Sequence, residues 1–256
     1  MSRIQAEATL REAIRSAGPR PPDNANRETK KNYAELLSNR VAGALAMCLR
    51  GLGLIDCQPD LAGGRERQFA GGIGAKRVDV SYATEEDGLI LAVSVKSISF
   101  PDRRTRNYQK NLTNRRGDLL AEATTLHQRF PYAVIGGVFL FDEGAERDGT
   151  DRRPSTVVTA HEYFRAFDRR GSQSNAVEKF EALGIVLYRA APPIGFRYYH
   201  AGEPDTERPL ESFFQRLLER TAERNPDRFR YADERLILRR LPPVPPRAGP
   251  VGDVDE

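Results

Sequence analysis

Cysteine and histidine are scarce in this chain of 256 residues, and their scarcity excludes two classes of chemistry. The two cysteines, Cys48 and Cys57, lack the paired spacing of a zinc site, so we expect them to be buried thiols. The three histidines, His127, His161 and His200, lie far apart without metal-ligand spacing. Histidine-based catalysis is therefore not expected.

Long apolar runs and repeated motifs are also lacking. The chain has no run of about eighteen apolar residues, and its N-terminal residues are polar and charged. These features predict a protein without a membrane span, located in the cytoplasm. No internal repeat and no ATPase or methyltransferase motif is apparent, so either of those activities would require a partner.

Charged residues, in contrast, are plentiful and nearly balanced in sign. They make up 30% of the chain, hydrophobic residues make up 39%, and the net charge is +4. A chain of this length can bury one substantial core. We expect an N-terminal helix and linker at 1–27, a main domain at 28–240 and a polyproline or disordered tail at 241–256. Within the main domain, the core would span about 28–145, followed by a C-terminal annex.

Hydrophobic periodicity predicts helices first and then strands. Helical spacing predicts a helix over 2–17 and a long core helix over 28–52. The glycine-rich and arginine-rich residues 62–75 predict a surface loop. An alternating segment followed by a continuous apolar segment predicts a β-hairpin over 77–97, with its turn at 85–88.

The following segments complete an α/β pattern. After a polar stretch at 100–116, helical spacing begins at Leu119 and ends before Pro131, and residues 133–141 predict a buried strand. The order strand, strand, helix, strand predicts an α/β fold with a mixed sheet flanked by helices. Weaker patterns predict helices near 157–168, 176–183 and 210–223, and strands at 185–188 and 196–200.

Polar residues on the predicted hairpin suggest a site. Asp79 lies on the first strand and Lys96 at the end of the second, where pairing can bring them together, and Ser94 shares a face with Lys96. The order Asp79, then Ser94-Val95-Lys96, resembles the PD-(D/E)XK nuclease superfamily, in particular type II restriction endonucleases. Serine stands here where that family usually has a carboxylate before x-lysine.

The resemblance implies a restriction-endonuclease-like fold and a Mg²⁺ site, and a Mg²⁺ site needs more than one anionic ligand. The next helix offers Asp118 and Glu122, four residues apart on one face. Some restriction enzymes have serine before x-lysine and a glutamate on the following helix. By that resemblance Glu122 is the second carboxylate, with Asp118 as second choice. The resemblance also makes the carbonyl of Val95 a ligand and places Glu35 near the metal.

These residues would have separate roles in phosphodiester hydrolysis. Metal held by Asp79 and Glu122 would polarise a phosphoryl oxygen and lower the pKa of a bound water. Lys96 would orient that water and stabilise developing negative charge. Taken singly, each residue also has a simpler interpretation as an exposed strand or helix side chain.

Basic residues are concentrated beside this candidate site. From Lys96 to Arg116 the chain has seven lysines and arginines and one acid, Asp102. The interleaved asparagine, glutamine, threonine and tyrosine side chains are able to bind phosphates or base edges. The residues expected to bind double-stranded DNA are Arg103, Arg104, Arg106, Lys110, Arg115 and Arg116. A second basic group, before the hairpin, comprises Arg65, Arg67, Lys76 and Arg77.

These observations together predict a Mg²⁺-dependent DNA endonuclease of a restriction or phage-defence system. Two alternatives stay open. One is a catalytically inactive, nuclease-fold DNA-binding subunit of a larger complex, suggested by Ser94, and the other is a structure-specific repair nuclease. Cutting both strands of a palindromic site would suit a homodimer, and a restriction system would include a cognate methyltransferase or another defence partner.

Overall fold

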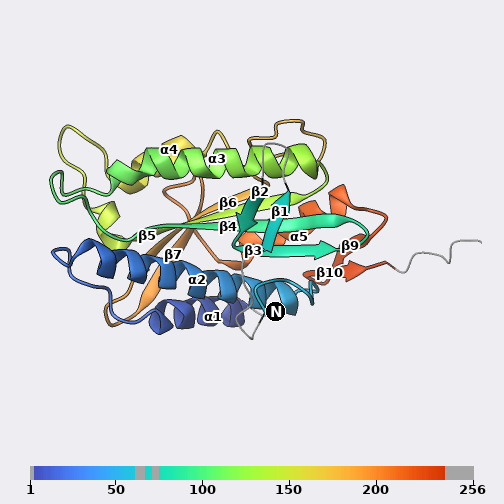
Figure 1. Cartoon of the computed structure of the whole chain (residues 1–256), viewed down its shortest axis with the longest axis horizontal. Coiled ribbons are helices and arrows are strands. Elements are labelled where there is room, and N and C mark those ends of the chain that lie inside the picture. Colours follow the sequence, from blue (N-terminus) through green and yellow to red (C-terminus); the bar gives the residue numbers. More distant parts are fainter. Residues whose placement is uncertain (1–2, 61–66, 71–74, 240–256) are drawn as a thin grey trace, which may run out of the picture.

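The protein is a sandwich of three layers, with a mixed β-sheet between two layers of helices (Figure 1). The computed structural model describes residues 3–60, 67–70 and 75–239. The sheet has six strands in the order β3-β4-β5-β6-β7-β8. This architecture confirms the expected α/β fold with a mixed sheet flanked by helices.

The three central strands of the sheet are parallel and the outer strands are antiparallel to their neighbours. The strands are β3 (Val80–Thr84), β4 (Gly88–Ile98), β5 (Val134–Asp142), β6 (Ala182–Arg189), β7 (Gly195–His200) and β8 (Glu207–Arg208). The central strands β4, β5 and β6 are almost continuously apolar because both of their faces are covered.

Each face of the sheet has its own hydrophobic core. The helices are α1 (Arg3–Ser16), α2 (Arg27–Gly51), α3 (Leu112–Arg129), α4 (Thr156–Phe164) and α5 (Glu211–Arg224). Side chains from α1, α2 and α5 pack with Val93 and Val95 of β4 on one face. Side chains from α3 and α4 pack with Ala92 and Ile98 of the same strand on the other face. Neighbouring residues of β4 therefore point into different layers.

Shorter elements surround the sheet. They are the 3-10 helices η1 (Gln109–Asn111) and η2 (Glu143–Glu146) and the strands β1 (Arg67–Ala70), β2 (Ala75–Val78), β9 (Phe229–Ala232) and β10 (Arg235–Leu238). The β1–β2 hairpin lies beside α3 and β4, and the β9–β10 hairpin lies beside α5. The expected core, 28–145, and the expected annex share one sheet, because β6, β7 and β8 extend it.

Most of the predicted elements are confirmed. They include the helices at 2–17, 28–52 and 210–223, the hairpin with its turn near 85–88, and the strands at 133–141, 185–188 and 196–200. Cys48 and Cys57 are buried free thiols, as expected, and burial raises the pKa of each to about 12. Within the described ranges, no helix combines the length and apolar character needed to cross a membrane.

Three local predictions are wrong for tertiary reasons. Residues 176–183 do not form a helix, because the N–H groups of Phe180 and Glu181 donate to the carbonyls of Phe167 and Ile135 and β6 begins at Ala182. Within the expected loop 62–75, residues 67–70 form β1, which pairs with β2 from residue 75, and the rest of the loop lies outside the described residues. Helix α3 begins at Leu112, well before Leu119, because Leu112 is buried in the core. The tail 241–256 lies outside the described residues.

Candidate functional site

Asp79 stands where the chain passes from β2 into the main sheet. The ladder between β3 and β4 begins with Val80 opposite Val93, so Asp79 lies just beyond the paired residues. Its side chain takes the place of a strand partner, since the N–H of Val95 donates to Asp79 Oδ2 at 2.6 Å. The N–H and C=O of one strand residue point to the same side. The Val95 carbonyl therefore points to the side on which Asp79 lies.

Three further side chains meet Asp79 between β4 and α3. Ser94 and Lys96 lie on the face of β4 that α3 covers, and Glu122 reaches them from α3. The Ser94 hydroxyl donates to Glu122 Oε2 at 3.0 Å. Lys96 Nζ lies 3.3 Å from the same oxygen and 3.7 Å from Asp79 Oδ2. The two carboxylate oxygens are therefore at most about 7 Å apart.

Burial and charge act on these groups in opposite directions. The Glu122 side chain is only 7% exposed, and this burial raises its pKa although Lys96 opposes the rise. Burial by itself lowers the pKa of Lys96, but attraction to Glu122 and Asp79 outweighs burial, so the pKa of Lys96 is raised. Arg115 is close enough to oppose that rise. The cluster thus holds the protonated side chain of Lys96 beside two carboxyl groups.

The donor set is compatible with Mg²⁺. This cation is commonly held by one or two carboxylates together with substrate phosphates, and it keeps several waters. Glu122 Oε1 is buried and has no hydrogen-bond partner in the described part of the chain, so it is open to a cation. The described residues contain no group of three histidine, cysteine or acidic side chains that would hold a metal. Asp79, Glu122 and the Val95 carbonyl would hold Mg²⁺ with water and substrate completing its shell.

The other two acids named from the sequence lie apart from the cluster. The Asp118 side chain is 56% exposed and its carboxylate is 3.4 Å from Arg115. The Glu35 side chain is 61% exposed and pairs with Lys31 on α2 at 3.5 Å. Of the two acids considered on α3, Glu122 is the one that reaches Lys96.

The six basic residues expected to bind DNA differ in their surroundings. Lys110 pairs with Asp102, and Arg103 donates to the carbonyl of Asn24. Arg104 and Arg106 are exposed. The Arg116 guanidinium lies 5.1 Å from the centre of the Tyr163 ring. Arg115 is exposed and lies on the helix that carries Glu122, within electrostatic range of Lys96.

A set of contacts that the sequence did not reveal holds both ends of the basic segment 100–107. Arg20 Nε donates to the carbonyl of Ser99 at 2.9 Å and pairs with Asp142 at 3.1 Å. The Tyr108 hydroxyl donates to Asp142 at 2.8 Å, and the Tyr108 N–H donates to Asp148 at 2.8 Å. The only sequence signal was that Asp142 follows an apolar strand.

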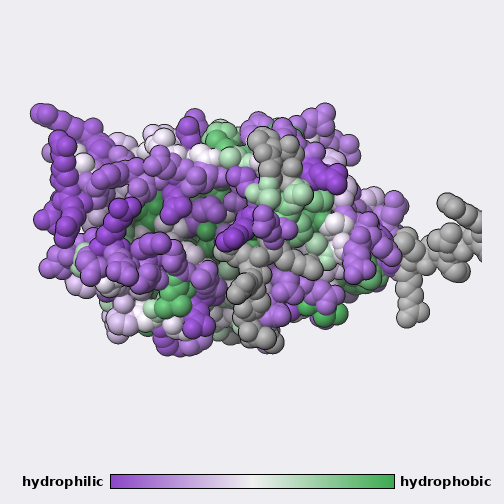
Figure 2. Space-filling view, in the orientation of Figure 1, coloured by the Kyte–Doolittle hydropathy of each residue, from purple (hydrophilic) through white to green (hydrophobic). Residues whose placement is uncertain are grey.

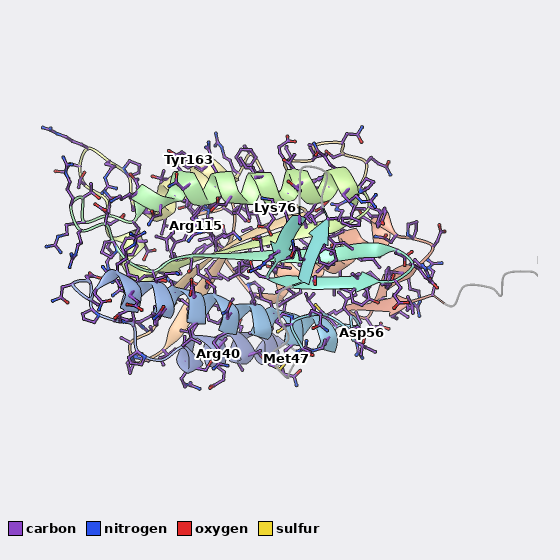
Figure 3. All side chains as sticks on the ribbon, viewed as in Figure 1. Arg40, Met47, Asp56, Lys76, Arg115 and Tyr163 are labelled. Carbon is purple, nitrogen blue, oxygen red and sulfur yellow. The ribbon has the colours of Figure 1, made fainter. Side chains whose placement is uncertain are left out.

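The face of the molecule that carries Arg115 and Lys76 is mainly hydrophilic. Figure 2 shows polar residues over most of this face, with hydrophobic side chains visible in the recess between the two helical layers. Figure 3 shows Arg115 below α3 and Lys76 on β2 on this same face. Of the second basic group, Arg65 and the side chain of Arg67 lie outside the described residues, and Arg77 is exposed.

No family model, no curated protein and no solved structure matches the chain.

Proposed function

We propose that the protein is a Mg²⁺-dependent endonuclease of the PD-(D/E)XK type that hydrolyses phosphodiester bonds in double-stranded DNA. The observation that carries the proposal is the convergence of Asp79, Lys96 and Glu122 in one partly buried cluster. Isolated surface charges would not leave a lysine side chain only 17% exposed between two carboxylates. The arrangement is typical of a functional site in which charged side chains are brought together away from bulk water.

Each residue of the cluster has a task in this reaction. Mg²⁺, when bound, supplies a Lewis acid that polarises a phosphoryl oxygen and lowers the pKa of water. Asp79 and Glu122 would hold the cation, and Ser94 would keep Glu122 in place through the hydrogen bond to its Oε2. Lys96 would orient the attacking water and stabilise the negative charge that develops on the phosphate.

The basic segment supports a nucleic acid as substrate. Seven lysines and arginines lie between Lys96 and Arg116 against one acid, Asp102, which Lys110 neutralises. Such a concentration favours binding to a phosphate backbone. A twofold homodimer would cut both strands, and in a restriction or phage-defence system the enzyme would act in the cytoplasm with a cognate methyltransferase or another defence partner.

A second candidate is a DNA-binding subunit that does not cut. It is favoured by the charge balance of the cluster, where Lys96 already contacts both carboxylates. It is also favoured by the lack of a third acidic, cysteine or histidine ligand among the described residues. In this case the basic segment would bind DNA and the cluster would be structural.

One experiment distinguishes these functions. The wild type, Lys96→Ala and Glu122→Gln proteins are incubated with supercoiled plasmid, linear duplexes and branched duplexes, in Mg²⁺ or EDTA. Asp118→Asn is the matched control, because it removes an exposed acid from the same helix. We expect Mg²⁺-dependent cutting by the wild type and Asp118→Asn, and none by the other two.

The alternative outcomes are equally informative. Cutting that is unchanged in Lys96→Ala would refute the assigned chemistry. A wild type that binds duplex DNA tightly, in a salt-dependent manner, without cutting any substrate would identify the second candidate. Cutting restricted to branched DNA would indicate a structure-specific repair nuclease.

A further inference from the structure

The Lys96 ammonium occupies the space between the two carboxylates that would hold a metal. Its Nζ atom lies 3.3 Å from Glu122 Oε2 and 3.7 Å from Asp79 Oδ2. Ser94 also donates to Glu122 Oε2, so this oxygen already has two donors from β4. The negative charge of the two carboxylates is therefore partly balanced by a cation that belongs to the chain.

A divalent cation would bind the same two carboxylates, with Glu122 Oε1, which lacks a hydrogen-bond partner among the described residues, as one of its ligands. Metal–oxygen distances for Mg²⁺ and Ca²⁺ are about 2.0 to 2.6 Å, which would bring the metal into direct repulsion with an ammonium that contacts both carboxylates. The low exposure of the Lys96 and Glu122 side chains limits screening of that repulsion by water and salt. Either the ammonium withdraws or the metal binds weakly.

We propose that Lys96 is the resident counter-ion of this site and that a divalent cation binds in competition with it. The proposal rests on the proposed function, in that Asp79 and Glu122 are taken as the metal-holding carboxylates. In the free protein Lys96 lowers the affinity for metal. A DNA phosphate offers Lys96 another anionic partner, so DNA binding releases the carboxylates to the metal. Metal binding and DNA binding are then mutually favourable, because such coupling is reciprocal.

The test is the affinity of the full chain for Mg²⁺ without DNA, measured by isothermal titration calorimetry. Lys96→Met removes the charge and keeps most of the side-chain volume, so its dissociation constant should be at least about tenfold below that of the wild type. Lys96→Arg keeps the charge and should bind as weakly as the wild type. Lys31→Met is the matched control, because this exposed lysine pairs with Glu35 on α2, away from the cluster, and it should leave the affinity unchanged.

Circular dichroism checks that each variant folds, and Lys96→Gln is a second neutral variant if Lys96→Met does not fold. Equal or weaker Mg²⁺ binding by the neutral variants, with wild-type binding lost in Glu122→Gln, overturns the competition and leaves the proposed metal centre intact. If neither the wild type nor any Lys96 variant binds Mg²⁺ without DNA, the competition is overturned, and the Mg²⁺-dependent cutting assay decides the proposed function separately. Tight Mg²⁺ binding by the neutral variants, with weak binding by the wild type and Lys96→Arg, supports the competition.

Discussion

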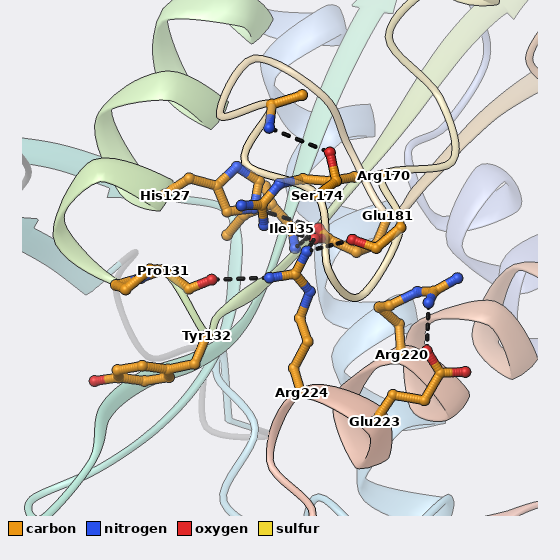
Figure 4. A network of polar contacts seen from close by, with 12 residues as sticks. His127, Pro131, Tyr132, Ile135, Arg170, Ser174, Glu181, Arg220, Glu223 and Arg224 are labelled. Atoms are coloured by element: carbon orange, nitrogen blue, oxygen red, sulfur yellow. Dashed lines mark hydrogen bonds and ion pairs between the residues drawn. The ribbon is translucent and has the colours of Figure 1, made fainter.

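Replacement of Glu181 by glutamine is expected to lower the free energy of unfolding by about 3–5 kcal/mol, because it removes the counter-charge of two buried arginines. The Glu181 side chain is fully buried, and the side chains of Arg170 and Arg224 are 3% and 5% exposed. Their nitrogens lie 3.0 and 3.1 Å from Glu181 Oε1. Figure 4 shows these groups converging on one carboxylate.

The other oxygen of Glu181 is also fully engaged. The Ile135 N–H donates to Oε2 at 2.7 Å, and His127 Nε2 lies 3.3 Å from the same atom. A glutamine keeps one acceptor oxygen, but its NH₂ group must face either the two arginines or the Ile135 N–H, all of which are donors. The substitution therefore leaves two buried cations without their counter-charge and breaks at least one hydrogen bond. Both changes lower the free energy of unfolding, which accounts for the size of the expected effect.

Urea unfolding at pH 7 measures this loss. At about 3 kcal/mol per molar urea, the upper end of the range for small proteins, the unfolding midpoint of Glu181→Gln should fall by about 1 M or more. The matched control is Glu223→Gln, whose side chain is 48% exposed and pairs with Arg220 one helical turn away. Such exposed pairs contribute about 0–1 kcal/mol. If the free energy of unfolding falls by the same small amount in both variants, the assigned role of the buried network is wrong.

Three further predictions concern single side chains of the site and the core. Arg115→Ala should weaken duplex binding several-fold and reduce the salt dependence of binding by about one phosphate contact. Arg116→Ala should have a smaller effect, because the Arg116 guanidinium packs on the ring of Tyr163. Fluorescence anisotropy at several salt concentrations would measure both effects. Ser94→Ala should raise the Mg²⁺ concentration needed for half-maximal cutting, because Glu122 loses the hydroxyl that holds its Oε2. Burial lowers the pKa of His161 to about 4, so the wild type should lose stability as pH falls from about 6.5 toward 4, and His161→Phe should lose less in urea unfolding at pH 7 and 4.5.

Clear results would contradict each of these. Equal effects of the two arginine variants on DNA binding would refute the distinction between the two side chains. A Mg²⁺ titration of cutting by Ser94→Ala that overlays the wild type would exclude its positioning role. An unchanged loss of stability on acidification in His161→Phe would show that protonation of other groups governs the acid range.

Much of the candidate site could be predicted from local sequence patterns. The period-two alternation around Asp79 and the spacing of Ser94 and Lys96 indicate which residues share a strand face. Helical spacing likewise places Asp118 and Glu122 on one side of α3. Each of these inferences concerns residues within a single element, where the backbone geometry alone determines which side chains are neighbours.

Contacts between distant residues were decided by the tertiary structure. Asp118 and Glu122 are equivalent in helical spacing, yet only Glu122 reaches β4, because α3 lies over the sheet at that turn and leaves Asp118 in solvent. Residues 176–183 have a helical pattern, but backbone hydrogen bonds of Phe180 and Glu181 to distant residues and the start of β6 at Ala182 override it. The local sequence thus determined the type of most elements and the chemistry of the cluster. Packing between elements determined which carboxylate meets Lys96, because burial and strand pairing depend on residues far apart in the chain.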